Sequence, residues 1–232
     1  MIQLYELILA DGCPVSPFVW RAKYALAHKG LAYETVPVGF TQIPTLLEGR
    51  SKTVPVIADG ERWVADSWAI ADYLDEAYPE LPALFSSPQE HAMVRFFDGW
   101  FSSQVMAPMF GLYVCDIHDR ARPEDQPYFR QSREQRLGGQ TLEAFTAGRE
   151  ERLPALRAAL QPMRLALRNA PFLGGDTANY ADYIALGGFL WVAAVSSLPP
   201  LAADDPLNDW LARGRALYGG LGEDARMRPL AA

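Results

Sequence analysis

The sequence is poor in the residues from which metal sites, disulfide frameworks and nucleic-acid surfaces are built. It has two cysteines and three histidines, and their spacing matches no metal-binding motif, so we expect neither a disulfide scaffold nor a metal site. Its 21 basic residues are outnumbered by 28 acidic ones, and the net charge of −7 argues against nucleic acid as a partner. No apolar run approaches the ~20 residues that span a membrane, and no targeting segment is evident. We therefore expect a cytoplasmic protein without a membrane anchor.

What is present is an ordinary globular composition, with 50% hydrophobic and 21% charged residues in a chain of 232. Residues 1–80 alternate strand-like and helix-like segments in the order β-α-β-α-β-β-α, including a hairpin that turns at Asp59-Gly60. The expected strands are 3–9, 33–36, 54–57 and 62–64. The expected helices are 16–29, 67–77 and a short one at 39–49 that contains a proline.

A proline- and serine-rich stretch near residues 78–88 indicates a linker, and the pattern after it is helical. The expected helical segments are 89–114, 128–146, 153–169, 179–195 and 205–218, with a loose tail over 219–232. The fourth of these segments is strongly apolar, as a central buried helix would be. We therefore predict an α/β domain over residues 1–80 followed by an all-helical domain over residues 88–232.

The first candidate for chemistry is Ser16, followed by Pro17 at a helix start directly after a strand. A helix N-terminus carries unpaired N–H groups and a partial positive charge, so a hydroxyl there can donate to an anion such as a thiolate. The helix N-terminus also lowers the pKa of a thiol. The alternative is that Ser16 is only an N-cap, a position that serine favours in any case.

The second candidate is the pair Val54-Pro55 at the entrance to a strand, where proline cannot donate to a sheet. A cis peptide would resolve this and would leave the backbone groups of Val54 to pair with an extended ligand. An ordinary proline on an edge strand is the alternative.

The third candidate is the pair Asp66-Ser67 immediately before a helix. The hydroxyl and N–H groups of this helix start could hold a carboxylate, and Asp66 could interact with an amino group. Helix capping is again the alternative. Taken together, the three pairs describe a site for a short peptide with a thiol, a carboxylate and an amino group, and glutathione fits this description.

With these motifs in this order, the sequence resembles the glutathione transferase superfamily over essentially its whole length. The motifs that carry the resemblance are Ser16-Pro17-Phe18, Val54-Pro55-Val56-Ile57, Asp66-Ser67-Trp68-Ala69-Ile70 and Asn179-Tyr180-Ala181-Asp182. The last of these matches a buried capping box of the family, in which Asn179 replaces the usual Ser or Thr. Within the superfamily the chain is similar to the bacterial glutathione-dependent β-aryl etherases of lignin breakdown and to related fungal transferases. Stretches such as Ser132-Arg133-Glu134-Gln135 and Asp205-Pro206-Leu207 carry this narrower resemblance.

The resemblance implies a thioredoxin-like N-terminal domain that binds glutathione, an all-α C-terminal domain and a homodimer. It assigns the catalytic hydroxyl to Ser16, the backbone-pairing residue to Val54 before Pro55, and the γ-glutamyl-binding pair to Asp66 and Ser67. Many relatives have a basic residue just before the valine, to meet the glycyl carboxylate of glutathione. Here that position is Thr53, with Lys52 one step earlier.

The second substrate is expected to be a hydrophobic aromatic molecule, and a helix rich in aromatic residues could line its site. Phe97, Phe101 and Phe110 are the candidates, although aromatic residues at helical spacing are more often core. Two alternative functions stay open. One is a non-catalytic carrier that binds glutathione and aromatic compounds, and the other is a thiol transferase that uses Cys13 of Cys13-Pro14-Val15-Ser16 as its nucleophile.

Overall fold

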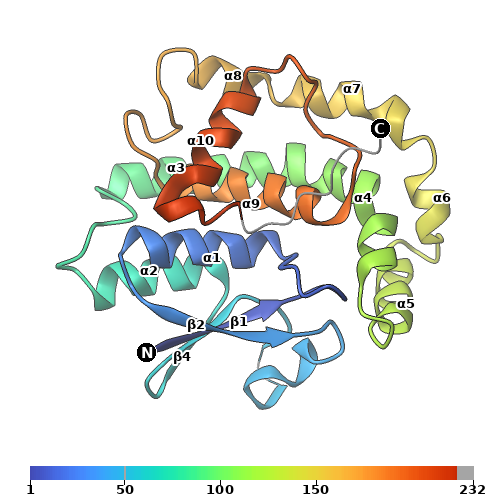
Figure 1. Ribbon diagram of the computed structural model, residues 1–232, viewed down its shortest axis with the longest axis horizontal. Helices are drawn as coiled ribbons and strands as arrows, with labels where there is room; N and C mark the ends of the chain where they lie inside the picture. Colours follow the sequence, from blue (N-terminus) through green and yellow to red (C-terminus); the bar gives the residue numbers. More distant parts are fainter. Residues whose placement is uncertain (50, 224–232) are drawn as a thin grey trace.

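The computed structural model describes residues 1–49 and 51–223, and within them a four-stranded sheet is followed by an array of helices (Figure 1). The elements of the N-terminal part are β1 (Ile2–Leu7), α1 (Pro17–His28), β2 (Tyr33–Val38), the 3₁₀ helix η1 (Ile43–Gly49), β3 (Val56–Asp59), β4 (Arg62–Ala65) and α2 (Ser67–Ala77). This is the predicted order, and the predicted short helix at 39–49 is a 3₁₀ helix that starts later. The thioredoxin-like α/β fold of this part and the helical fold of the rest are confirmed.

The sheet is mixed, with the strand order β2-β1-β3-β4. Strand β1 pairs in parallel with β2 and antiparallel with β3, and β3 forms the predicted hairpin with β4. Gly60 takes a φ of 59° at the hairpin turn, a conformation that glycine adopts without strain. Because β1 lies inside the sheet, its Ile2 and Leu4 are buried against the helices.

After a segment without helix or strand at residues 78–87, the chain is helical. The elements there are α3 (Pro88–Phe101), the π-helical turn η2 (Ser102–Met106), α4 (Ala107–Arg120), α5 (Gln126–Arg136), α6 (Leu142–Thr146), α7 (Arg149–Ala159), α8 (Gln161–Ala166), α9 (Tyr180–Val195) and α10 (Leu207–Gly220). The helix predicted from 89 to 114 thus continues to Arg120 through the π turn. None of the helices in the described ranges is both long enough and apolar enough to cross a membrane.

Two predicted helical segments are each divided in the structure. The segment 128–146 breaks between α5 and α6, where Gly138 and Gly139 take φ values of 68° and 89°. Such values end a helix, and glycine adopts them more readily than other residues. The segment 153–169 divides at Leu160, two residues before Pro162 in the first turn of α8. Most of the predicted tail, residues 224–232, lies outside the described residues.

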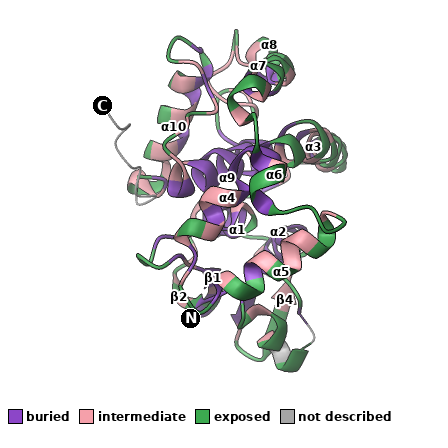
Figure 2. Ribbon diagram, turned by 90° about the vertical axis from the view of Figure 1, so that its right-hand side faces the viewer, coloured by how far each residue is buried: buried purple, intermediate pink, exposed green. Residues whose placement is uncertain are grey.

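Helix α9 is the centre of the molecule, and nearly all of its residues are buried (Figure 2). Helix α1 packs along it, so that the two parts of the chain share one hydrophobic core. The packing is close, since a Cβ atom on Gly187 would lie 2.3 Å from the carbonyl oxygen of Pro17. This contact fixes the first turn of α1, the turn that carries the predicted chemistry, against a rigid helix.

His28, at the end of α1, joins the two parts of the chain at the opposite end of this contact. Its Nδ1 lies 2.7 Å from the hydroxyl of Tyr183 on α9, and its Nε2 lies 3.0 Å from the carbonyl oxygen of Ala83. Burial lowers the pKa of His28 below its ordinary value. The other groups that face it are the hydroxyl of Tyr218 and the charged side chains of Asp75, Lys29 and Glu90.

We expect the free energy of unfolding to fall when the pH is lowered through about 6.5, because the unfolded chain then protonates His28 while the folded chain resists it. Above that pH both states hold the neutral ring, and His28 adds no pH dependence. In His28→Gln this part of the pH dependence should disappear, as urea denaturation at about pH 7.5 and 5.5 would measure. The matched control is His91→Gln on α3, and an unchanged pH dependence in His28→Gln would contradict the prediction.

Candidate functional site

A cavity of about 310 Å³ lies between the first turn of α1, the loop before β3, and helices α4, α5 and α9. Figure 1 shows the N-terminal end of α1 on the side of the molecule where α4 and α5 lie. The walls of the cavity are mainly apolar. The apolar residues that line the cavity are Leu7, Val15, Pro17, Phe18, Phe40, Ile43, Val54, Met106, Phe110, Ile117, Phe129 and Trp191. The polar side chains that line the cavity are Ser16, Thr53, Tyr128 and the three cations Lys52, Arg133 and Arg136.

Ser16 is the N-cap of α1 and also lines the cavity, so that both sequence interpretations describe it. Its Oγ accepts a hydrogen bond of 3.3 Å from the backbone N–H of Val19. No acceptor for the hydroxyl hydrogen of Ser16 is found among the described residues. Pro17 at the first helical position removes one N–H from this end of the helix without loss, since that N–H has no partner inside the helix. The hydroxyl is therefore free to donate to an anion in the cavity.

Val54 brings a second predicted residue to the same cavity, and the peptide that joins it to Pro55 is cis. In the part of the chain that the structure describes, no group hydrogen bonds to the backbone N–H or C=O of Val54. The carbonyl oxygen of Pro55 accepts from the N–H of Asp66 at 3.1 Å. This bond joins the loop before β3 to the start of α2.

Asp66 and Ser67 lie beside the cavity but do not line it. Oδ1 of Asp66 caps α2 by accepting from the N–H groups of Trp68 at 2.9 Å and Ala69 at 3.1 Å. Asp66 has a φ of 81°, which strains the backbone of a residue other than glycine, and such strain concentrates at functional sites. Ser67 is buried, and its carbonyl oxygen accepts from the hydroxyl of Tyr180 on α9 at 2.7 Å. The start of α2 is thus held from both sides.

A buried ion pair that the sequence did not reveal joins helices α1, α2 and α3. Arg21 on α1 lies 2.9 Å from Oδ1 of Asp98 on α3, and the indole Nε1 of Trp68 donates to Oδ2 of Asp98 at 2.6 Å. Arg21 is almost fully buried, and breaking such a pair would leave a charge without its partner. This network positions α1 and α2 relative to each other.

The structure places one of the three aromatic candidates in the cavity. Phe110 lines it, but Phe101 is completely buried, where it stacks on Phe97 with ring centroids 5.7 Å apart. Phe97 lines a separate hollow with Phe96 and Met163. Phe97 and Phe101 therefore do not line the cavity beside Ser16. At ~100° per residue, Phe97 and Phe101 share one face of α3, and the π-helical turn at Ser102–Met106 separates them from Phe110 on α4.

Most of the cavity wall comes from residues that sequence reasoning did not select. Phe40 and Phe129 meet with ring centroids 4.9 Å apart, which joins the loop after β2 to α5. Asp125 holds this junction, because it accepts from the N–H of Thr41 at 2.8 Å and from Nε of Arg122 at 2.8 Å. Burial alone would raise the pKa of Asp125, but these donors hold it below its ordinary value. No local pattern predicts a contact between residues this far apart in the sequence.

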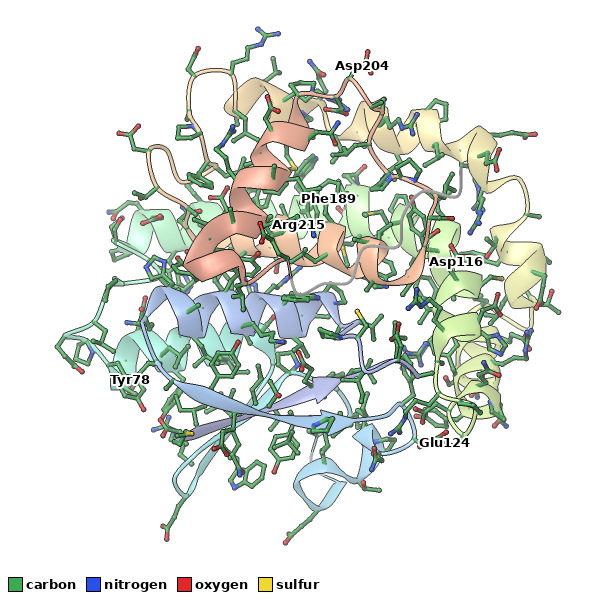
Figure 3. All side chains as sticks on the ribbon, in the orientation of Figure 1. Tyr78, Asp116, Glu124, Phe189, Asp204 and Arg215 are labelled. Atoms are coloured by element: carbon green, nitrogen blue, oxygen red, sulfur yellow. The ribbon has the colours of Figure 1, made fainter. Side chains whose placement is uncertain are left out.

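Cys13 lies in the loop before α1, with a side chain that is buried and does not line the cavity. His118 lies on α4, where its Nδ1 is 3.0 Å from Oδ1 of Asp119, and it also does not line the cavity. Asp116 of the same helix pairs with Arg149 at 2.7 Å and is labelled in Figure 3. Of Cys13, Ser16 and His118, Ser16 is therefore the one that lines the cavity.

Comparison with known proteins identifies relatives over both parts of the chain. A family model described as "Glutathione S-transferase, N-terminal domain" matches residues 12–82, and one described as "Glutathione S-transferase, C-terminal domain" matches residues 92–198. Glutathione S-transferase U7 of Arabidopsis thaliana is 31% identical over 184 residues, which are 78% of this chain and 68% of the relative. Glutathione S-transferase U1 of the same plant is 26% identical over 188 residues, 80% of this chain and 71% of the relative.

Solved structures give the same result. The structure of a glutathione S-transferase of Ceriporiopsis subvermispora in complex with glutathione has a TM-score of 0.79 and 27% identity, covering 99% of each chain. A glutathione transferase of Phanerochaete chrysosporium has a TM-score of 0.75 and 27% identity, covering 98% of each chain. Both similarities extend over the sheet and the helices together.

Proposed function

The chain belongs to the glutathione S-transferase family, and on this premise we propose that it transfers the glutathionyl group to hydrophobic aromatic electrophiles bound in the cavity beside Ser16. The observation that carries the proposal is the Ser16 hydroxyl, which lies at the N-terminus of α1, borders the apolar cavity and has a hydrogen to donate. Glutathione is the co-substrate, held by residues of the N-terminal domain.

In this proposal glutathione lies along the starts of α1, β3 and α2. Its cysteinyl backbone pairs with the unpaired N–H and C=O of Val54, beside Pro55. The γ-glutamyl group meets the start of α2, where Ser67 and the N–H groups of the helix hold its carboxylate and Asp66 faces its amino group. Lys52 lines the cavity from the same loop as Val54 and meets the glycyl carboxylate. The two domains divide near residues 80 and 88, and the family suggests a homodimer.

Ser16 would donate a hydrogen bond to the thiolate of glutathione, and the dipole of α1 would favour the same negative charge. The sulfur is then the nucleophile, and Ser16 forms no covalent bond. The thiolate attacks an electrophilic carbon, a C–S bond forms, and the bond to the leaving group breaks with its electron pair. Trp191, Phe110 and Phe129 surround the acceptor and exclude water from the reacting atoms.

We further propose that the natural electrophile is a β-aryl ether of the lignin type. The bond broken would then be the C–O bond at a carbon next to a ketone, and the phenolate that leaves takes a proton from the solvent. The resemblance of the stretches at 132–135 and 205–207 to the β-aryl etherases supports this narrower reaction.

The test is a glutathione-dependence assay with a panel of aromatic β-aryl-ether ketones and a generic chloro-nitrobenzene acceptor. Phenol released only in the presence of glutathione would support ether cleavage, and enantiopure ethers would then define the stereochemistry. Conjugation of the chloro-nitrobenzene without ether cleavage would leave a broad transferase. Binding of glutathione without turnover of either substrate would overturn the enzymatic proposal and leave a carrier of aromatic compounds.

A further inference from the structure

We infer that the aromatic electrophile carries a carboxylate, which Arg133 and Arg136 of α5 bind, so that the enzyme prefers anionic aromatic substrates to neutral ones. This inference rests on the proposed function, because it assigns a substrate class to the same cavity. Three observations lead to it: the sign of the charges in the cavity wall, the lack of an acidic partner for Arg133 within residues 1–49 and 51–223, and the way the Arg133 side chain is held.

The cavity wall has one sign of charge although the whole protein has the other. Lys52, Arg133 and Arg136 line it, and no aspartate or glutamate does so among the residues that the structure describes. The chain as a whole has a net charge of −7. Glu124, at the turn before α5 (Figure 3), lies 3.4 Å from Arg122 and is not part of the wall. A concave apolar site with only cations in its wall attracts anions and binds them more tightly than an open surface would.

Arg133, like Arg136 on the same helix, has no carboxylate partner among the residues that the structure describes. On the same helix, Arg130 lies 2.9 Å from Glu134 and 2.7 Å from Glu143. The hydrogen bond of Arg133 goes to the hydroxyl of Ser132 at 2.9 Å, a neutral acceptor. Burial and, to a smaller extent, the positive charge of Arg136 together lower the pKa of Arg133 to about 10. A bound anion stabilises a half-buried guanidinium that a neighbouring cation repels.

The position of the Arg133 side chain is fixed by aromatic rings and leaves hydrogen-bond donors unused. Its guanidinium carbon lies 4.6 Å from the ring centroid of Phe129 and 5.6 Å from that of Phe40. These cation–π contacts hold the guanidinium in place on the cavity wall. The cation–π contacts provide no hydrogen-bond acceptor for the N–H groups of Arg133. A planar guanidinium presents these N–H groups in the geometry that a carboxylate accepts. The rings are also part of the apolar wall, so an aromatic ring and a carboxylate of one ligand would be bound side by side.

The glycyl carboxylate of glutathione is the other anion that could meet these arginines. In the proposed arrangement, glutathione lies against the N-terminal domain, where Lys52 and Val54 share one loop. Arg133 and Arg136 come from the helical domain and lie with Phe129 in the wall of the acceptor site. We therefore assign Lys52 to glutathione and the two arginines to the acceptor. The experiment distinguishes the carboxylate of the acceptor from the glycyl carboxylate of glutathione.

The experiment compares 4-chloro-3,5-dinitrobenzoate with the neutral 4-chloro-3,5-dinitrobenzamide as acceptors for the full-length protein. The wild type should have the higher kcat/KM for the benzoate. In Arg133→Met the ratio of kcat/KM for benzoate to that for benzamide should fall about 30-fold, as expected when a charge-assisted hydrogen-bonded pair is lost. Arg133→Lys should recover part of the ratio. The matched control is Arg130→Met, which removes the same charge from the same helix outside the cavity and should leave the ratio unchanged.

A ratio that does not change in Arg133→Met would overturn the inference. So would a rise in KM for glutathione with both acceptors, because this would assign Arg133 to the glycyl carboxylate. If Arg133→Met fails to fold, the exposed Arg136→Met gives the same comparison, with an expected fall of about fivefold for a more solvated pair. If neither acceptor is conjugated, the proposed function fails first. The affinities of the glutathione-loaded protein for the benzoate and the benzamide, measured by quenching of tryptophan fluorescence, then decide the inference separately.

Discussion

Ser16→Ala is expected to lower kcat for conjugation about 100-fold while the KM for glutathione changes less than about threefold. Removing one preorganised donor to a developing or resident anion costs ~10²–10³ in rate in other enzymes. The proposed contacts of glutathione at Val54 and at the start of α2 are unchanged in this variant, so we expect its binding to be largely preserved. The measurement is steady-state kinetics with the chloro-nitrobenzene acceptor, together with equilibrium binding of glutathione.

The physical cause of this loss can be tested by its pH dependence. In the proposed role the Ser16 hydroxyl favours the thiolate over the thiol, so its removal should raise the pKa of the bound thiol toward the ~8.5 of a free one. The rate deficit of Ser16→Ala should therefore become smaller as the pH rises through that value. Ser16→Thr keeps the hydroxyl and should lose much less activity than Ser16→Ala.

Cys13→Ser is the matched control, because Cys13 is the alternative nucleophile and lies three residues before Ser16. The thiol of Cys13 is buried and does not line the cavity, so Cys13→Ser should retain activity. Full activity in Ser16→Ala combined with loss of activity in Cys13→Ser would contradict the role of Ser16 and support the thiol transferase. Since Ser16 also caps α1, thermal unfolding of Ser16→Ala is needed to show that the loss of activity does not result from unfolding. Loss of a cap typically costs ~1 kcal/mol.

The parts of the fold that were predicted from sequence are those that depend on local chemistry. Ser16 followed by Pro17 defines the start of α1, and Asp59-Gly60 defines a hairpin turn, because these residues favour particular backbone angles or caps. The capping box of α9 was expected with Asn179 as its first residue, and it is confirmed. In each case a few neighbouring residues contain the whole signal.

The cavity wall could not be predicted in the same way, because it is assembled from segments that meet only in the folded chain. Phe40 and Phe129 contact each other although the sequence places them in different domains. Arg133 was noted as part of a stretch shared with the etherases, but nothing local distinguishes it from Arg130, which has carboxylate partners. The difference is set by where α5 packs, and this depends on the whole helical array.

Asp182→Ala is expected to lower the free energy of unfolding by about 4 kcal/mol, because it removes a buried carboxylate that accepts from four donors of the described residues. Asp182, in the first turn of α9, is fully buried. Its Oδ1 accepts from the N–H of Leu173 and the indole Nε1 of Trp210, each at 2.8 Å, and its Oδ2 accepts from the N–H groups of Gly174 at 3.0 Å and Asn179 at 3.1 Å. Each donor left without a partner costs ~1 kcal/mol or more.

The size of this loss follows from what the carboxylate joins. It connects the loop before α9 and helix α10 to the helix against which α1 packs, so its removal weakens the support of the site as well as one helix start. For a chain of this length the melting temperature should fall by ~10 °C.

Asp182→Asn should lose less stability than Asp182→Ala, since the amide oxygen still accepts two hydrogen bonds while its NH₂ group opposes the other two donors. Asp176→Ala, at an exposed position in the same loop, is the control and should change stability by less than ~0.5 kcal/mol. Equal stability of Asp182→Ala and Asp176→Ala in urea denaturation would show that these four hydrogen bonds do not hold α9 in place.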